Sequence, residues 1–251
     1  MRMITFSVLK KCKIKFPSYQ LTRTTVTISS DALLPKFDFN KLKGDLNYVE
    51  VLPSWKRNEE KELRADVLRN MRILPDFVTE AEEASLLSEV EPQLKRMRYE
   101  FDHWDNAIEG YRETERSAWR EENEAVLARV KAVFPRDAVL LPHVHILDLA
   151  AAGHIKPHVD AVRFCGDVIA GLCLLSSAVM RLTHEKRPHL ALDALLQRRC
   201  LYIMSGVARY DFSHAVLGGE ESVWRGDRLP RTRRVAIICR EQPKKTDDST
   251  D

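Results

Sequence analysis

The chain has 251 residues, which is enough for one ordinary domain with extensions and a sizeable core. Hydrophobic residues make up 44% of it, as in soluble globular proteins, and no apolar stretch approaches the ~20 residues that span a bilayer. The net charge of +3 comes from 40 basic and 37 acidic residues, but six of the basic residues and none of the acidic ones lie in residues 1–30. The remainder therefore has 34 basic and 37 acidic residues, which argues against a general nucleic-acid footprint.

Residues 1–30 have the composition of a mitochondrial transit peptide: they are basic, free of acids and rich in Ser and Thr. We therefore expect the protein in the mitochondrial matrix. A basic disordered tail is the alternative. The five cysteines are odd in number and contain no CxxC pair, which argues against a disulfide framework or a zinc ribbon and suits a reducing compartment.

Residues 31–70 have weak periodicity, and we interpret them as a linker with one short helix near Glu59 to Arg69. Thr79 to Glu82 match a capping box, so a helix should begin there, with a break or kink at Pro92. A second helix is predicted from about Ser117, and Pro135 should end it. The two helices are expected to buttress one face of a sheet.

From Val139 onward, short apolar strands alternate with turns, as in an all-β sandwich. Val168 to Leu175 fit one buried strand, and Asp193 to Leu196 suggest a brief helical turn. Residues 201 to 214 predict a strand, a turn at Gly206 and a second strand that ends at His214. Residues 71–241 should form the domain, and the polar residues 242–251 should be a disordered tail.

His158, Asp160 and the distant His214 offer two imidazoles and one carboxylate. This ligand set leaves half of an octahedron open, as a non-haem Fe(II) oxygenase needs for a cosubstrate and O₂. Positions 158 and 160 are two apart, so on a strand their side chains leave the same face.

Arg234 and Arg240 lie six residues apart on one late apolar strand, so their side chains should also share a face. Two guanidinium groups near such an iron suit a carboxylate cosubstrate, because planar arginine donors bind carboxylates bidentately. The alternative is that both belong to a basic surface cluster with neighbouring arginines. This alternative is disfavoured because Arg is rarely buried among apolar residues without a specific partner.

The other histidines carry weaker signals. His143 and His145 form an H-x-H pair that could open a cupin metal site, but no Glu follows at a useful spacing. We interpret His103 and its neighbour Trp104 as packing residues and expect His184 and His189 in a solvated loop.

Four segments resemble those of the AlkB family of Fe(II)- and 2-oxoglutarate-dependent dioxygenases, in particular its mitochondrial branch. The similarity covers roughly residues 71 to 241, and it includes stretches outside the histidine and arginine pattern. The segments are Arg98–Glu115, Gly153–Asp160, Phe164–Leu172 and Ala208–His214. The resemblance implies an α+β, mainly β fold, namely a double-stranded β-helix or jelly roll buttressed by N-terminal helices.

The resemblance also implies residue roles. His158, Asp160 and His214 would ligate Fe(II), and the residues that would contact the cosubstrate 2-oxoglutarate are Tyr202, Arg234, Val235, Ala236 and Arg240. In the family's reaction, O₂ and 2-oxoglutarate are consumed, succinate and CO₂ leave, and a substrate C–H bond is hydroxylated. A hydroxylated N-methyl group then releases formaldehyde.

The substrate is open. Family members that act on nucleobases clamp a flipped base with a lid of extra hairpins, and no clear pair of such hairpins precedes His143. Duplex DNA is therefore not expected as a substrate. The resemblance implies demethylation of mitochondrial RNA or hydroxylation of a protein, with a role in fatty-acid metabolism and regulated necrosis. A catalytically silent, metal-containing interaction module is the alternative.

Overall fold

The computed structural model describes residues 37–102 and 106–244. Its helices are α1 (Lys61–Asn70), α2 (Glu80–Leu94), α3 (Glu121–Lys131) and the short α4 (Gly206–Tyr210), with 3₁₀ turns η2 (Leu46–Tyr48) and η3 (Gly219–Glu221). The strands are β1 (Val49–Val51), β2 (Met71–Leu74), β3 (Ile108–Arg116), β4 (Val144–His158), β5 (Val168–Leu174), β6 (Ala178–His184), β7 (Ala191–Leu196), β8 (Leu201–Ser205), β9 (Phe212–Val216), β10 (Val223–Trp224), β11 (Asp227–Arg228) and β12 (Arg234–Arg240).

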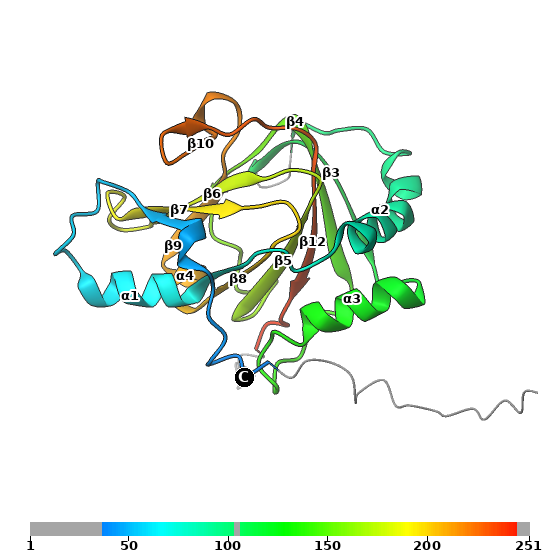
Figure 1. Ribbon diagram of the computed structural model, residues 1–251, viewed down its shortest axis with the longest axis horizontal. Helices are drawn as coiled ribbons and strands as arrows, with labels where there is room; N and C mark the ends of the chain where they lie inside the picture. Colours follow the sequence, from blue (N-terminus) through cyan, green and yellow to red (C-terminus); the bar gives the residue numbers. More distant parts are fainter. Residues whose placement is uncertain (1–36, 103–105, 245–251) are drawn as a thin grey trace, which may run out of the picture. The chain divides into compact units, whose positions relative to one another are not determined.

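Ten of the twelve described strands form one nearly closed antiparallel sheet, in agreement with the expected jelly roll, and β10 pairs with β11 in a separate two-stranded sheet. The order of the large sheet is β1-β7-β6-β9-β4-β12-β5-β8-β2, with β3 added beside β4 (Figure 1). The long strand β4 belongs to both halves of the roll. Its first part pairs with β12 and β3. Its last part, from Ile155, pairs with β9 on both sides of a bulge between Ile155 and His158. Strand β4 therefore carries residues from one half of the sheet into the other.

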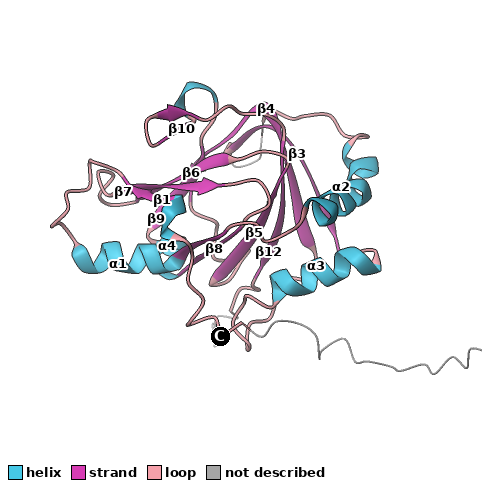
Figure 2. Cartoon of the chain, in the orientation of Figure 1, coloured by secondary structure: helices cyan, strands magenta, loops and turns pink. Residues whose placement is uncertain are grey.

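Alternating side chains give the central strands two apolar faces. We call the face that carries Leu147, Cys173, Tyr202 and Ala236 the inner face; its residues pack in one cluster. The outer face packs in a second cluster with α2 and α3, which lie together on one side of the sheet (Figure 2). Outer-face strand residues include Ile146, Leu172, Ile203, Val235 and Ile237. The predicted buttress of two helices is confirmed.

The capping box at the start of α2 is confirmed, because the Thr79 side chain accepts from the Glu82 amide while Glu82 accepts from the Thr79 amide. The helix does not break at Pro92 but continues for two residues to Leu94, where it ends. Pro92 lies in the last turn, so only the hydrogen bond that its missing N–H would make to the preceding turn is lost. Helix α3 begins at Glu121, four residues later than predicted, and is followed by a short turn before Pro135.

The segment interpreted as a linker is in part built into the domain. The short helix that we predicted is present as α1, and it packs against α4 with Val67 fully buried. Strand β1 pairs with β7, and Trp55 stacks on Phe212. A three-residue strand is too short to give an alternating pattern, which is why its sequence resembled a connection.

Two further corrections concern strands. Residues 193–196 belong to β7, not to a helical turn, because Asp193 pairs with Arg181 across β6 while its neighbours are buried. Strand β3 was not predicted as a strand, since its sequence is mostly charged. Its charges have cross-strand partners: Arg112 donates to Asp148 at 2.7 Å, and Glu113 contacts His145 at 2.8 Å.

Residue 206 begins the short helix α4, not a simple turn, and His214 lies in the middle of β9, not at its end. The predicted strands over 168–174 and 234–240 are confirmed. The predicted transit peptide and most of the predicted tail lie outside the described residues. Among the helices that the structure describes, none is long and apolar enough to cross a membrane.

Candidate active site

A cavity of about 1100 Å³ opens on the inner face of the sheet. Its walls come from β3, β4, β5, β6, β8, β9 and β12 and from the loop after β4. The lining includes the sequence-predicted residues His158, Asp160, Tyr202, His214, Arg234, Ala236 and Arg240. Residues that are up to 82 positions apart in the chain therefore meet in one place, as the strand order requires.

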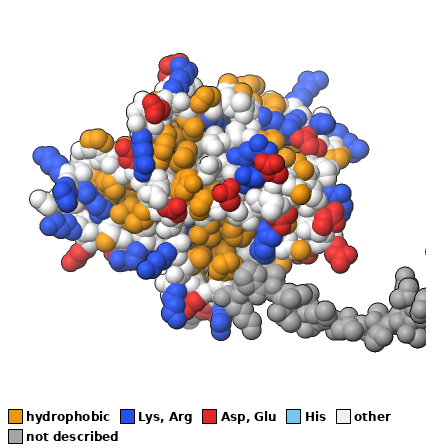
Figure 3. Space-filling view, in the orientation of Figure 1, with side chains coloured by type: hydrophobic (Ala, Val, Ile, Leu, Met, Phe, Trp, Pro, Cys, Tyr) orange, Lys and Arg blue, Asp and Glu red, His pale blue; other side chains and the backbone are white. Residues whose placement is uncertain are grey.

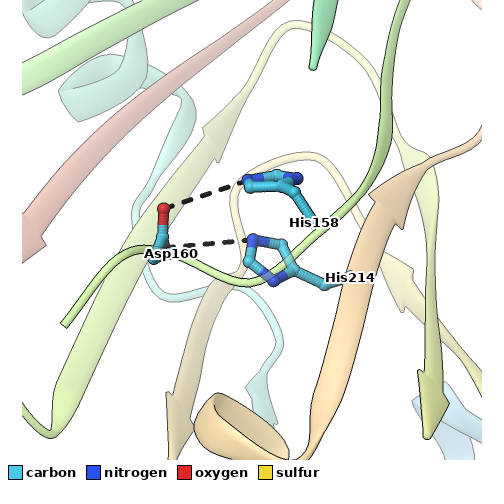
Figure 4. Close-up of side chains that lie close together, drawn as sticks. All are labelled: His158, Asp160 and His214. Carbon is cyan, nitrogen blue, oxygen red and sulfur yellow. Dashed lines mark ion pairs between the residues drawn. The ribbon is translucent and has the colours of Figure 1, made fainter. Parts of the chain in front are cut away.

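His158 and His214 are direct partners in the pairing of β4 with β9. Their ring centroids are 4.3 Å apart. Asp160, in the loop that follows β4, faces both rings: one carboxylate oxygen lies 3.9 Å from Nε2 of His158 and the other lies 4.0 Å from Nε2 of His214 (Figure 4). The donor atoms of the three side chains all lie within 4.8 Å of one another. Among the described residues, these three form the group of His, Cys, Asp or Glu side chains close enough together to hold a metal ion.

The surroundings of the three side chains suit a divalent metal. Nδ1 of His158 lies 2.9 Å from the carbonyl oxygen of Lys156, so Nδ1 carries the proton and Nε2 keeps its lone pair toward Asp160. The second nitrogen of His214, Nδ1, is buried without a hydrogen-bond partner. Distances near 4 Å between Asp160 and the rings are too long for hydrogen bonds, so the three groups do not satisfy one another.

Burial and nearby charge set the ionisation of this cluster. Burial, assisted by His158, lowers the pKa of His214 to about 3, which keeps its imidazole neutral. Burial alone would raise the pKa of Asp160, but Arg240 and then the two imidazoles outweigh it and leave that pKa below its usual value. A carboxylate and a neutral imidazole are the forms in which these side chains bind a metal.

Arg234 points into the cavity from β12 and is 2% exposed. Its Nη2 lies 3.2 Å from the sulfur of Cys173, and its buried Nε has no hydrogen-bond partner. Among the ion pairs of the described residues, none joins Arg234 to a carboxylate. A buried cation without an anion is unfavourable by itself, so this arrangement is suited to an anionic ligand.

Four of the five residues expected around the cosubstrate have side chains on the inner face of the sheet, and one has its side chain on the outer face. Tyr202, Arg234, Ala236 and Arg240 line the cavity. The side chain of Val235 does not: it is fully buried in the outer cluster, because neighbouring residues of a strand point to opposite faces. The alternative of a surface arginine cluster is wrong for Arg234 and does not describe Arg240, which also faces the cavity.

Comparison with known proteins decides the family. The chain is 48% identical over 192 residues to the Mus musculus alpha-ketoglutarate-dependent dioxygenase alkB homolog 7, mitochondrial, an alignment that covers 76% of this chain and 87% of the mouse protein. It is 53% identical over 173 residues to the Bos taurus protein of the same name, covering 68% and 78% of the two chains. This chain belongs to the alkB homolog 7 family of alpha-ketoglutarate-dependent dioxygenases. No protein-family model matches it.

Solved structures support the fold of this alkB homolog 7 family member. The structure of OsALKBH1 superposes with a TM-score of 0.51 and 12% identity, covering 68% of this chain and 97% of the other. A Pseudomonas putida prolyl-4-hydroxylase superposes with a TM-score of 0.50 and 12% identity, covering 70% and 93%. The chain is thus an Fe(II)- and 2-oxoglutarate-dependent dioxygenase with a double-stranded β-helix fold.

Two residues of this alkB homolog 7 family member were not assigned to the site from sequence. Arg209 of α4 is fully buried, and its Nη2 donates to the sulfur of Cys165 at 3.1 Å beside the loop that carries Asp160. It also contributes to the low pKa of Asp160. The only signal in the sequence was its place in the segment Ala208–His214. The second residue, Gly171, leaves room for the ring of Tyr202.

The remaining histidines of the chain have other surroundings. His143 is exposed and His145 contacts Glu113 and Arg240, so the H-x-H pair does not form a metal site. His145 nevertheless lines the cavity. His184 is buried against Phe212, contrary to the expected solvated loop, whereas His189 is exposed and contacts Glu59. His103 and Trp104 lie outside the described residues.

Proposed function

We propose that the cavity is the active site and that His158, Asp160 and His214 hold the Fe(II). The observation that carries this proposal is the direct pairing of His158 with His214 across β4 and β9, with Asp160 facing both rings. Two imidazoles and one carboxylate leave positions open for a cosubstrate and O₂. The bound iron supplies the activation of O₂, which lets succinate and CO₂ form from 2-oxoglutarate while a substrate C–H bond is hydroxylated.

We propose that 2-oxoglutarate lies along β12. Arg234 binds its distal carboxylate, because this guanidinium is buried and lacks a carboxylate partner among the described residues. Tyr202 lines the same cavity and would donate to that carboxylate, and burial keeps the phenol protonated by raising its pKa. Arg240 is placed for the carboxylate nearer the metal, and Ala236 leaves room between the two arginines.

The surroundings of the cavity favour a substrate other than duplex DNA. The lining beyond the proposed cofactor residues includes two acidic side chains, Glu113 and Glu115, and two basic ones, Lys156 and Arg163. On the face shown in Figure 3, basic and acidic side chains are interspersed around hydrophobic ones and form no continuous basic track. Affinity for a duplex depends mainly on the number of neutralised phosphates, so it should be low here.

The described residues between α2 and β4 hold β3 and α3, not a pair of hairpins. We propose that the enzyme hydroxylates a methyl group of single-stranded or structured RNA, or a protein side chain. The relatives are named mitochondrial, and residues 1–30 are basic and free of acids. Residues 1–30 would therefore direct the chain to the mitochondrial matrix. The role in fatty-acid metabolism and regulated necrosis stays a prediction.

The proposal is tested by competitive turnover at physiological salt, with the purified protein and matched amounts of methylated transfer RNA, methylated duplex DNA and matrix protein. The expected result is product on the transfer RNA or the protein and little on the duplex. Binding to RNA should weaken modestly as salt rises, because few phosphates are neutralised. Efficient demethylation of the duplex with the other two substrates untouched would contradict the proposal.

A further inference from the structure

Three side chains from adjacent strands form a chain of polar contacts along one wall of the cavity. Nη1 of Arg240, at the end of β12, lies 2.9 Å from Nδ1 of His145 on β4. Nε2 of His145 lies 2.8 Å from Oε2 of Glu113 on β3. All three residues line the cavity. The proposed roles of the iron ligands and of Arg234 make no use of His145 or Glu113.

The chemistry of the three groups fixes the direction of each hydrogen bond. A guanidinium can only donate, so Nδ1 of His145 accepts from Arg240. A neutral imidazole has one acceptor nitrogen and one N–H, so Nε2 of His145 carries the proton and donates to the carboxylate of Glu113. Glu113 thereby selects the tautomer that presents an acceptor to Arg240.

Arg240 needs such a partner to keep one position. Its long side chain has many rotamers, and among the ion pairs of the described residues none joins it to a carboxylate. Arg240 nevertheless faces the same cavity as Asp160. Its positive charge is the largest of the effects that lower the pKa of Asp160. The hydrogen bond to Nδ1 of His145 holds the guanidinium on this wall of the cavity.

We propose that His145, held in one tautomer by Glu113, is a positioning residue that orients Arg240 toward the carboxylate of 2-oxoglutarate nearer the metal. This inference rests on the proposed function of the cavity. It assigns a role to one histidine of the H-x-H pair that is not metal ligation. His143, two residues earlier and exposed, has no part in it.

The experiment compares His145→Ala, His145→Gln, Glu113→Leu and Arg240→Met with the parent protein and with the control His143→Ala. The rate of succinate formation gives kcat and the KM for 2-oxoglutarate, and anaerobic calorimetry of the Fe(II)-loaded protein gives the cosubstrate Kd. His145→Ala should raise KM and Kd about tenfold, as expected for loss of a hydrogen bond to a charged group, with a smaller change in kcat. His145→Gln should recover most of this loss, because an amide can accept from Arg240 and donate to Glu113.

The decisive variant is the double change His145→Ala with Arg240→Met. If His145 acts through Arg240, the histidine change should add almost nothing once the guanidinium is gone. Additive effects would overturn the inference, and so would a His145→Ala variant whose KM and Kd equal those of the His143→Ala control. Thermal unfolding identifies variants that fail to fold. Glu113→Leu removes the acceptor of the His145 N–H without changing β4, and it should raise KM in the same direction; an unchanged KM in this variant would count against the inference.

Failure of the inference and failure of the proposed function give different results. If the parent protein forms succinate and His145→Ala matches it, only the role of His145 is wrong. If the parent protein neither binds 2-oxoglutarate nor forms succinate, the proposed function itself fails.

Discussion

Gly171 of β5 lies directly opposite Tyr202 of β8, and the ring of Tyr202 occupies the space that a side chain at position 171 would need. A Cβ atom built on Gly171 would be 2.5 Å from the Tyr202 hydroxyl oxygen and closer still to two ring carbons. Real Cβ atoms do not approach other heavy atoms so closely. The glycine therefore determines where the phenol points, and the phenol lines the cavity.

Gly171→Ala should consequently displace Tyr202 and weaken the binding of 2-oxoglutarate, by about tenfold if one hydrogen bond to a carboxylate is lost. The measurement is the KM for 2-oxoglutarate in succinate formation, together with thermal unfolding. Gly226→Ala, the same change in an exposed turn, is the control and should affect stability alone. A Gly171→Ala variant with parental KM would show that Tyr202 does not contact the cosubstrate.

Arg234→Met removes the charge from the buried end of the cavity while it keeps most of the side-chain volume. Loss of one partner of a buried, hydrogen-bonded charge pair costs roughly 3–5 kcal/mol, so the Kd for 2-oxoglutarate should rise on the order of a hundredfold or more. Anaerobic calorimetry of the Fe(II)-loaded protein measures it, with the exposed Arg225→Met as the control. An unchanged Kd in Arg234→Met would remove Arg234 from the cosubstrate site.

Asp148 is expected to be a major contributor to stability. It is fully buried on β4 and accepts from Arg112 of β3 at 2.7 Å and from Nη2 of Arg233 at 2.7 Å. Asp148→Asn removes the buried charge that both guanidinium groups share. Arg112 loses its carboxylate and Arg233 keeps only Glu91, which costs roughly 3–5 kcal/mol. The midpoint of thermal unfolding should fall by on the order of 10 °C. A fall no larger than that of the exposed control Asp227→Asn would contradict this assignment.

Glu82 should make the stability of the domain sensitive to acid. The hydrogen bond from Arg129, together with the amide of Thr79, holds the pKa of Glu82 below its ordinary value of 4.5 despite partial burial. A carboxyl group whose pKa is lower in the folded state stabilises the fold above its unfolded pKa, and this contribution is lost as pH falls through the folded value.

Glu82→Gln keeps a side chain that can complete the capping box but removes the charge. The variant should be less stable than the parent at pH 7, and the difference should shrink below about pH 4.5 as the parental carboxyl is protonated. Thermal unfolding from pH 3 to pH 7 measures this, with the exposed Glu121→Gln as the control. A difference that stays constant over this range would show that the charge of Glu82 contributes nothing.

The sequence predicted those parts of the fold and site whose signals are local. The capping box at Thr79, the apolar run of β5 and the shared face of Arg234 and Arg240 each depend on residues a few positions apart. The ligand candidates were identified from the spacing of His158 and Asp160, the ligand types and the resemblance of their segments to the AlkB family.

The features that the sequence did not predict are the strand register at the site and the strand β3, and both depend on pairing between residues far apart in the chain. The register that places His158 opposite His214 joins residues 56 positions apart, and no local pattern encodes it. Strand β3 was missed because its charged residues find partners on β4 and α2 that are invisible in the sequence.

The central claim is that His158, Asp160 and His214 form one iron site, and succinate formation from 2-oxoglutarate tests it most directly. The parent protein with Fe(II) should form succinate from 2-oxoglutarate even without a known substrate. His158→Ala, Asp160→Ala and His214→Ala should each bind Fe(II) weakly and lose this turnover while they remain folded, whereas the exposed His143→Ala should keep it. Parental turnover in folded His214→Ala would contradict the account.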